Sequence, residues 1–177
     1  MKIRCVVTGQ TGRGKSVFVR DERMEPVTLA ALPGYEFHRV WGSEAMVQLP
    51  CDGAARGRLP YFPAAEGFRF AFFTVPPGGR RDVERMEPMA ALAEMQEKLP
   101  GLAEVMEPAH PGMHTTDTVD FDVVLNGEVV LELDDGAEVA LKAGDCVVQN
   151  GTRHRWSNRS KENCVIAVTL IGAKRDA

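Results

Sequence analysis

The sequence predicts an all-β protein, built as an antiparallel sandwich or barrel. Between residues 112 and 172, short apolar segments alternate with Gly-, Asn- and Asp-rich turn signals. Short strands at regular spacing, joined by tight turns, are typical of these architectures. The expected strands of this region are Val119–Leu125, Glu128–Leu133, Ala137–Leu141, Cys146–Gln149, Thr152–Trp156 and Asn163–Ile171. Asn126-Gly127 predicts a two-residue hairpin turn between the first two of them.

The first zone of the chain, residues 1–79, also indicates strands and loops. Its apolar stretches are interrupted by proline and glycine, and few helical signals occur. A Pro-Pro-Gly-Gly turn follows Val75 and ends the zone. The expected strands are Ile3–Thr8, Ser16–Val19, Glu36–Trp41, Ala45–Leu49 and Phe68–Val75.

A helical insert separates these two zones, within residues 80–110. The stretch from Asp82 to Leu99 is rich in Met, Ala, Leu and Glu, which favour helices. Pro100-Gly101 ends the periodic pattern. We therefore expect one helix near 84–99, with a shorter turn reaching residue 106.

Length and composition favour a single soluble domain spanning residues 1–177. The chain has 44% hydrophobic residues, a net charge of −4, and no apolar run long enough for a membrane span. We expect no signal peptide, no nucleic-acid partner and no membrane partner. The four cysteines show no CxxC spacing. Cys5, Cys146 and Cys164 are expected to be buried free thiols, which suits a reducing cytoplasm.

One nucleotide-binding pattern is present but lacks its structural context. Residues Gly9–Ser16 match the P-loop pattern GxxxxGK[ST]. A working P-loop needs a helix that begins at the lysine, so that backbone N–H groups surround the phosphates. Here the β-branched and aromatic run Val17–Arg20 follows, which indicates a strand. We interpret the glycines as a hairpin loop.

Polar residues at alternate positions mark the candidate site. In an extended chain, alternate side chains share a face. One face then lines a polar interior, such as the wet inside of a barrel, while the other belongs to a hydrophobic layer. The polar face carries His114, Thr116, Thr118, Asp120 and Asp122, and the apolar face carries Val119, Phe121 and Val123. His154 lies on a later strand and shares its face with Trp156.

Two histidines and one carboxylate on neighbouring strands allow two interpretations. His114, Asp120 and His154 could hold a divalent metal such as Zn, Fe, Mn, Ni or Co, with open positions for a ligand. Alternatively, these groups hydrogen-bond one another within a polar core. The spacing alone leaves both open.

The region 112–158 resembles the cupin superfamily. The first cupin motif is Gly-x5-His-x-His-x3–4-Glu-x6-Gly, and here His114, Asp120 and Gly127 match it, with Thr116 in place of the second histidine. The second motif is Gly, then Pro-x-Gly-x2-His-x3-Asn. Gly144, Gly151, His154 and Asn158 match it, and Gln149 replaces the proline. The sequence of these motifs is similar to that of small, single-domain cupins of bacteria and of fungal biosynthetic pathways.

The resemblance implies a jelly-roll β-barrel with its site inside. It implies metal ligation by the matched positions His114, Asp120 and His154, in a ligand set weakened by Thr116. It also implies a homodimer, since small cupins often pair through N-terminal strands. The helical insert is longer than the segment that usually precedes the first motif histidine. We expect it to pack on the outer surface of the barrel or to form a dimer contact. The alternative is a lid over the barrel mouth.

The expected function is that of a metal-dependent enzyme acting on a small organic acid or carbonyl compound. Lyase, decarboxylase, isomerase or dioxygenase chemistry would follow from the resemblance, with His154 and Asp120 as catalytic residues. Thr116, Trp156, Arg39 and Trp41 are candidate substrate-binding residues. For Arg39 we favour the alternative of a half-buried strand with its polar side in solvent, and we expect Arg69 to face solvent in the same way. The alternative function is a non-catalytic binding or sensing module with a degenerate metal site.

Overall fold

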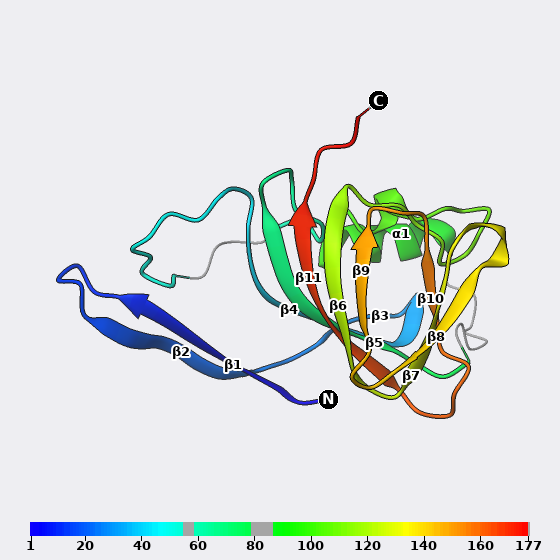
Figure 1. Cartoon of the computed structure of the whole chain (residues 1–177), viewed down its shortest axis with the longest axis horizontal. Helices are drawn as coiled ribbons and strands as arrows, with labels where there is room; N and C mark the ends of the chain where they lie inside the picture. Colours follow the sequence, from blue (N-terminus) through cyan, green and yellow to red (C-terminus); the bar gives the residue numbers. More distant parts are fainter. Residues whose placement is uncertain (55–58, 79–86, 177) are drawn as a thin grey trace.

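The computed structural model describes residues 1–54, 59–78 and 87–176 and shows a β-barrel with one helix (Figure 1). A six-stranded antiparallel sheet has the order β3-β4-β5-β11-β6-β9, and a three-stranded sheet has the order β10-β7-β8. The predicted fold class is confirmed. The large sheet comprises β3 (Val27–Leu29), β4 (Leu32–Ser43), β5 (Phe68–Val75), β6 (Thr118–Asn126), β9 (Cys146–Asn150) and β11 (Cys164–Gly172). The small sheet comprises β7 (Glu128–Glu132), β8 (Glu138–Lys142) and β10 (Arg155–Ser157).

β-Branched and aromatic residues explain why the central strands form. In β11 the inward residues Ile166, Val168 and Leu170 are all buried, and they alternate with outward ones. β11 pairs with β5 on one side and with β6 on the other, so the N-terminal and C-terminal zones share one sheet. That shared sheet joins both zones of the chain around the same core.

The P-loop pattern lies in a hairpin, as expected. β1 (Ile3–Gln10) and β2 (Ser16–Met24) pair antiparallel, and the glycines lie in the loop between them. No helix follows Lys15. The hairpin extends away from the barrel (Figure 1). Its loop therefore has no phosphate-binding geometry.

Two expected strands and one expected turn need correction. Ala45–Leu49 forms no strand, and the expected strand Thr152–Trp156 is replaced by the shorter β10. The turn at Asn126-Gly127 is not a hairpin, because β6 and β7 belong to different sheets. Only Gly127 takes a positive φ there, and a Cβ on it would lie 2.6 Å from the carbonyl oxygen of Asn163. The glycine is needed where the chain passes from one sheet to the other.

Two burial expectations are also wrong. Phe121, expected in the hydrophobic layer, is 48% exposed on the outer face of the sheet, while the polar face of β6 is the inner one. Cys146 is exposed, whereas Cys5 and Cys164 are buried, and all four cysteines are free thiols. The reducing compartment stays a prediction.

The helical insert is present. Helix α1 (Pro88–Lys98) begins with proline at its first turn, and a 3₁₀ turn (Ala103–Val105) follows it. The expected start near residue 84 lies outside the described residues. In the part of the chain that the structure describes, no helix has the length and apolarity needed to cross a membrane.

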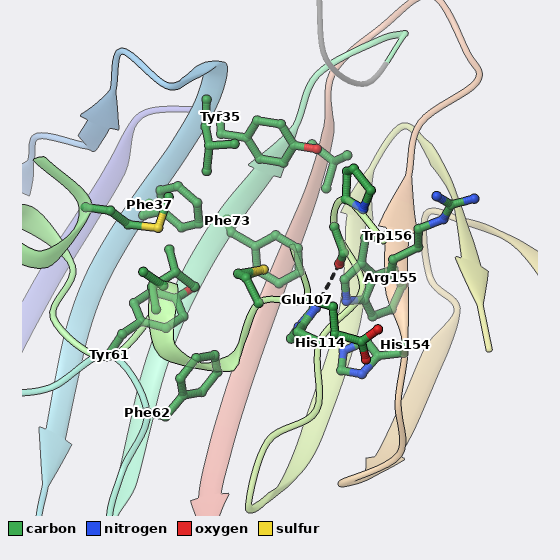
Figure 2. Close-up of a pocket in the computed structure, with 18 of the residues that line it drawn as sticks. Tyr35, Phe37, Tyr61, Phe62, Phe73, Glu107, His114, His154, Arg155 and Trp156 are labelled. Atoms are coloured by element: carbon green, nitrogen blue, oxygen red, sulfur yellow. Dashed lines mark hydrogen bonds between the residues drawn. The ribbon is translucent and has the colours of Figure 1, made fainter. Parts of the chain in front are cut away.

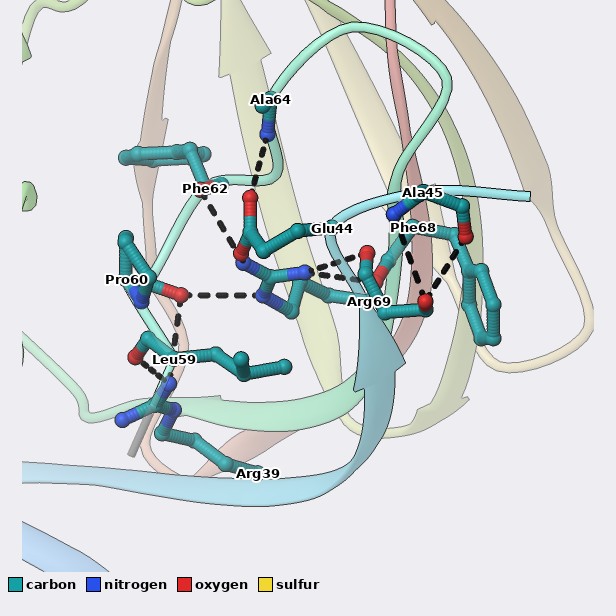
Figure 3. A network of polar contacts seen from close by, with 10 residues as sticks. Arg39, Glu44, Ala45, Leu59, Pro60, Phe62, Ala64, Phe68 and Arg69 are labelled. Atoms are coloured by element: carbon teal, nitrogen blue, oxygen red, sulfur yellow. Dashed lines mark hydrogen bonds and ion pairs between the residues drawn. The ribbon is translucent and has the colours of Figure 1, made fainter. Parts of the chain in front are cut away.

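A buried arginine ties the loop before β5 to the sheet (Figure 3). Arg69 is 4% exposed, and its guanidinium donates to the carbonyl oxygens of Ser43, Pro60 and Phe68 at 2.8–2.9 Å. It also pairs with Glu44, and the cost of burial lowers its pKa to about 10. We had expected Arg69 to face solvent. Instead it fixes the segment that carries two aromatic residues into the barrel.

We predict that Arg69→Met lowers the free energy of unfolding by about 3 kcal/mol, because buried carbonyl groups lose their donor. Urea denaturation followed by circular dichroism measures this. Arg4→Met is the matched control, since Arg4 forms an exposed ion pair with Asp21, and such pairs contribute little. Equal midpoints for the two variants would contradict the role given to Arg69.

Candidate ligand cavity

The barrel encloses a cavity of about 570 Å³ with one aromatic wall (Figure 2). Strands β4 and β5 supply part of this wall, and the loop held by Arg69 supplies the rest. The backbone N–H of Tyr61 donates to the carbonyl oxygen of Pro100 at 2.7 Å, which joins this loop to the end of the helical insert. The aromatic wall consists of Tyr35, Phe37, Tyr61, Phe62 and Phe73.

The opposite wall is polar, and a backbone pairing organises it. His114 and His154 exchange two N–H···O=C hydrogen bonds of 3.0 Å, although neither lies in a regular strand. The pairing brings their imidazole rings to a centroid distance of 4.2 Å. Both rings line the cavity. The structure therefore brings together two of the three residues that the sequence placed at the site.

Hydrogen bonds fix the proton on each imidazole. The Nδ1 atoms lie 3.0 Å and 2.9 Å from the carbonyl oxygens of Gly112 and Thr152 respectively. Because a carbonyl only accepts, each neutral ring carries its proton on Nδ1 and keeps a lone pair on Nε2. Burial lowers the pKa of both imidazoles, and that of His154 falls to about 4, with the neighbouring His114 as a further cause. Both rings are neutral acceptors at pH 7.

Two buried carboxylates complete the polar side. Asp120 and Asp122 line the cavity from β6 and are 5% and 4% exposed. Oδ1 of Asp120 has no hydrogen-bond partner among the described residues. Burial raises the pKa of Asp120 to about 6. Burial, and then the charge of Asp120, raise the pKa of Asp122 to about 8.

Charged residues at the cavity edge are paired with one another. Glu107 accepts two hydrogen bonds from Arg153, at 2.6 and 2.7 Å. Arg155 is held by Glu132 at 2.6 Å. Glu107 and Arg155 line the cavity, but each has its charge balanced by its partner. The two aspartates form no ion pair within the described residues.

Of the other candidate residues, Trp156 lines the cavity and the rest lie outside it. Trp156 lines the cavity, and its ring centroid lies 6.2 Å from that of His154. Thr116 is buried and accepts a hydrogen bond from Thr118, but it is not a lining residue. Arg39 donates to the carbonyl oxygen of Pro60, and Trp41 lies beside Arg20. Neither Arg39 nor Trp41 lines the cavity.

The donor set does not form the predicted metal site. Among the described residues, no three His, Cys, Asp or Glu side chains form a group that could hold a metal ion. The two Nε2 atoms of His114 and His154 provide two donors, and Asp120 does not join them. Since a stable protein site normally has at least three ligands, we derive no chemical step through a metal.

The sequence did not predict the aromatic wall, and it placed Asp122 on the polar face without a role in the site. Asp122 follows Asp120 by two residues, so the same alternation that pointed to Asp120 applies to it. The aromatic residues lie between 41 and 119 residues from the histidines in sequence. Only the pairing of β4 with β5 and of β5 with β11 brings them opposite the polar wall.

The helical insert covers this cavity. Met95 of α1, together with Leu102, Ala103 and Met106, lines it. Leu99 is fully buried against Leu29 and Phe37. The insert thus forms part of the cavity wall, as in the lid alternative, rather than lying on the outer barrel surface.

The fold and the site together define an antiparallel β-barrel with an interior cavity lined by histidine and aspartate. Residues 102–170 match the family model described as "Cupin_2: Cupin domain". This match confirms, for residues 102–170, the resemblance seen in the sequence.

Short stretches of the chain are similar to proteins of fungal biosynthesis clusters. Over 48 residues, 27% of this chain, the identity is 54% with phomopsin biosynthesis cluster protein C′ of Diaporthe leptostromiformis. Over 56 residues, 29% of this chain, it is 50% with oryzines biosynthesis cluster protein J of Aspergillus oryzae. The matched stretches span 25% and 31% of these relatives' own lengths.

Solved cupin structures resemble the chain over most of its length. The cupin domain of Schizosaccharomyces pombe Cnp3 is 10% identical, with 97% of this chain and 87% of that one covered and a TM-score of 0.48. A cupin 2 conserved barrel protein of Salinispora arenicola is 16% identical, with 87% and 92% covered and a TM-score of 0.45.

The buried carboxylates predict a stability loss at mildly alkaline pH in chelator-treated protein. Asp122 keeps its proton to about pH 8 when folded and has lost it well below pH 6.5 when unfolded. At this group the folded state then binds more protons, so the contribution of Asp122 to the free energy of unfolding falls by about 1.5 kcal/mol from pH 6.5 to 8. Asp122→Asn removes this fall.

Urea denaturation at each pH measures the effect as the difference between the unsubstituted protein and Asp122→Asn. The histidines act in the opposite direction and equally in both proteins, because each is neutral in the folded state but titrates near pH 6.5 when unfolded. Asp135→Asn, in the exposed turn between β7 and β8, serves as the control. The same pH dependence in the unsubstituted protein and in Asp122→Asn would show that Asp122 is ionised or solvated.

Proposed function

We propose that the protein binds a small organic molecule inside its barrel. The observation that carries this proposal is the cavity itself, with an aromatic wall facing a wall of two imidazoles and two carboxylates. Its volume suits a ligand of drug-like size or smaller, and polar groups opposite an apolar wall orient such a ligand. The ligand's apolar body would lie against Tyr61 and Phe73.

Binding can be followed through Trp156, because the chain has two tryptophans and only Trp156 lines the cavity. In a Trp41→Phe background, we expect saturable fluorescence changes with small aryl-alkyl compounds such as 3-phenylpropan-1-ol. The matched control is Trp156→Phe, which leaves Trp41 as the reporter and should show no saturable change. Unchanged Trp156 emission up to millimolar concentrations of neutral, cationic and anionic compounds would contradict an accessible cavity.

We further propose that the site is catalytic and moves a proton, as lyase, isomerase and decarboxylase reactions require. Asp120 is the general base, since burial brings its pKa to about 6, close to the pH at which a base is both ionised and effective. Ser157 lines the cavity and its buried hydroxyl has no partner among the described residues, so this hydroxyl is our candidate donor to a developing oxyanion. His154 would accept a hydrogen bond from the substrate through Nε2.

Proton transfer is measured as exchange of the hydrogens next to a ketone carbonyl, with 4-phenylbutan-2-one in D2O. The C–H bond breaks, Asp120 takes the proton, and a deuteron then returns to the carbon. We expect Asp120→Asn to lower the exchange rate at least tenfold, with Asp135→Asn unchanged. Binding without any exchange would favour the alternative function, a non-catalytic binding or sensing module.

A resident divalent metal remains a prediction of the sequence. Zn, Fe, Mn, Ni or Co bound at His114, Asp120 and His154 would require Asp120 to join the two imidazoles. Metal analysis of the purified protein, with and without chelator, measures the content directly, and the exchange assay is run on both samples.

We also propose a homodimer formed through the outer face of the six-stranded sheet. Phe70, Thr169, Phe121 and Val148 are neighbours in the strand register across β5, β11, β6 and β9. Phe121 and Val148 are 48% and 55% exposed. The outward residues of these four strands carry no charge, so two copies of this face would meet without repulsion. They are Phe68, Phe70, Phe72, Ala167, Thr169, Ile171, Val119, Phe121, Val123, Cys146, Val148 and Asn150.

Val148→Lys is expected to convert the dimer to a monomer, because it places two like charges inside the interface. Size-exclusion chromatography with light scattering measures the mass. Val139→Lys is the matched control, since Val139 is 49% exposed on β8 of the small sheet. A monomeric unsubstituted protein would contradict the interface.

A further inference from the structure

The cavity contains more negative than positive charge. Glu107 and Arg155 at its edge are each neutralised by an opposite charge. Asp120 and Asp122 have no such partner in the described part of the chain. A buried carboxylate that lacks a cation is costly. The cavity is therefore built around a charge that the described residues do not balance.

The hydrogen-bonding groups of the cavity have the same bias. The Nε2 atoms of His114 and His154 present lone pairs, because both Nδ1 protons are used on backbone carbonyls. Asp120 lines the cavity, and its buried Oδ1 has no partner among the described residues. These three groups accept hydrogen bonds, so a ligand that donates several is the best match.

The aromatic wall adds a third, independent feature. Tyr35, Phe37, Tyr61 and Phe73 line one side of the cavity, and Trp156 lies next to the histidines (Figure 2). Aromatic faces attract cations, and the attraction grows when water is excluded. A ligand that combines a cation with an apolar group would therefore meet both carboxylates and aromatic faces in this cavity.

We propose that the ligand carries a protonated amine or ammonium group, which lies against the Asp120–Asp122 pair while its apolar body packs on the aromatic wall. This inference rests on the proposed ligand-binding function and names the class of ligand. It replaces the organic acid expected from the sequence, because a carboxylate would add negative charge beside the Asp120–Asp122 pair, whereas an ammonium group compensates the charge of that pair. With the ammonium group paired to Asp122, Asp120 remains available as a base.

A charge series on one carbon skeleton tests the ligand class. The probes are 3-phenylpropan-1-amine, 3-phenylpropan-1-ol and 3-phenylpropanoate, titrated into chelator-treated protein at pH 7 with Trp156 fluorescence and calorimetry as readouts. We expect the amine to bind at least tenfold more tightly than the alcohol, and the acid to bind more weakly than both. Tighter binding of the acid than of the amine would overturn the inference.

Two variants identify the carboxylates as the cause. Asp122→Asn and Asp120→Asn should each lower the ratio of amine to alcohol affinity at least fivefold while alcohol binding persists. Asp135→Asn, which removes the same charge from an exposed turn, should leave the ratio unchanged. An unchanged ratio in both cavity variants would overturn the inference.

The outcomes separate this inference from the proposed function. If the alcohol binds and the amine has no advantage, the cavity binds ligands but the cationic class is wrong. If none of the three probes binds, both proposals fail. N,N,N-Trimethyl-3-phenylpropan-1-aminium, which has no N–H donor, separates the two sources of preference. If this compound also binds more tightly than the alcohol, charge and aromatic contact cause the preference. If it does not, hydrogen bonding to Asp120 causes the preference of the amine. Either result supports the inference.

Discussion

The rest of the site depends on the reciprocal backbone pairing of His114 and His154. The two residues exchange their N–H and C=O groups just before β6 and just before β10, where the large and small sheets approach each other. This pairing joins the two sheets at the cavity and places both imidazoles side by side. The backbone carbonyls on Nδ1 then orient each ring, so the pairing determines geometry and protonation together.

Opposed walls give the cavity its chemistry. The aromatic residues come from the N-terminal half of the chain and the polar ones from the C-terminal half, and β5 and β11 meet between them. Arg69, although outside the cavity, holds the loop that carries Tyr61 and Phe62, and the helical insert covers the same side. A polar group inside an apolar enclosure has strengthened electrostatic interactions, which is why two unpaired aspartates matter here.

The polar face of β6 is the enclosed one, as the alternation of polar and apolar residues predicted. The apolar face differs from the prediction, because it lies on the outside of the barrel rather than in a buried layer. Phe121 is exposed there, while Asp122 is buried on the opposite face. An apolar outer face is unusual for a sheet in water, and the proposed interface between copies would cover it.

The sequence by itself determined the strands from Val119 to Leu125 and from Phe68 to Val75 and the helix before Pro100. These follow from local alternation and helix-forming composition, which are properties of neighbouring residues, whereas the convergence of His114 with His154 was implied by the cupin resemblance. Only the tertiary structure decided that Asn126-Gly127 passes between sheets, that Arg39 and Trp41 lie outside the cavity, and that Asp120 forms no metal-holding group with the histidines among the described residues. Strand order and burial decide these features, because they depend on contacts between residues far apart in the chain.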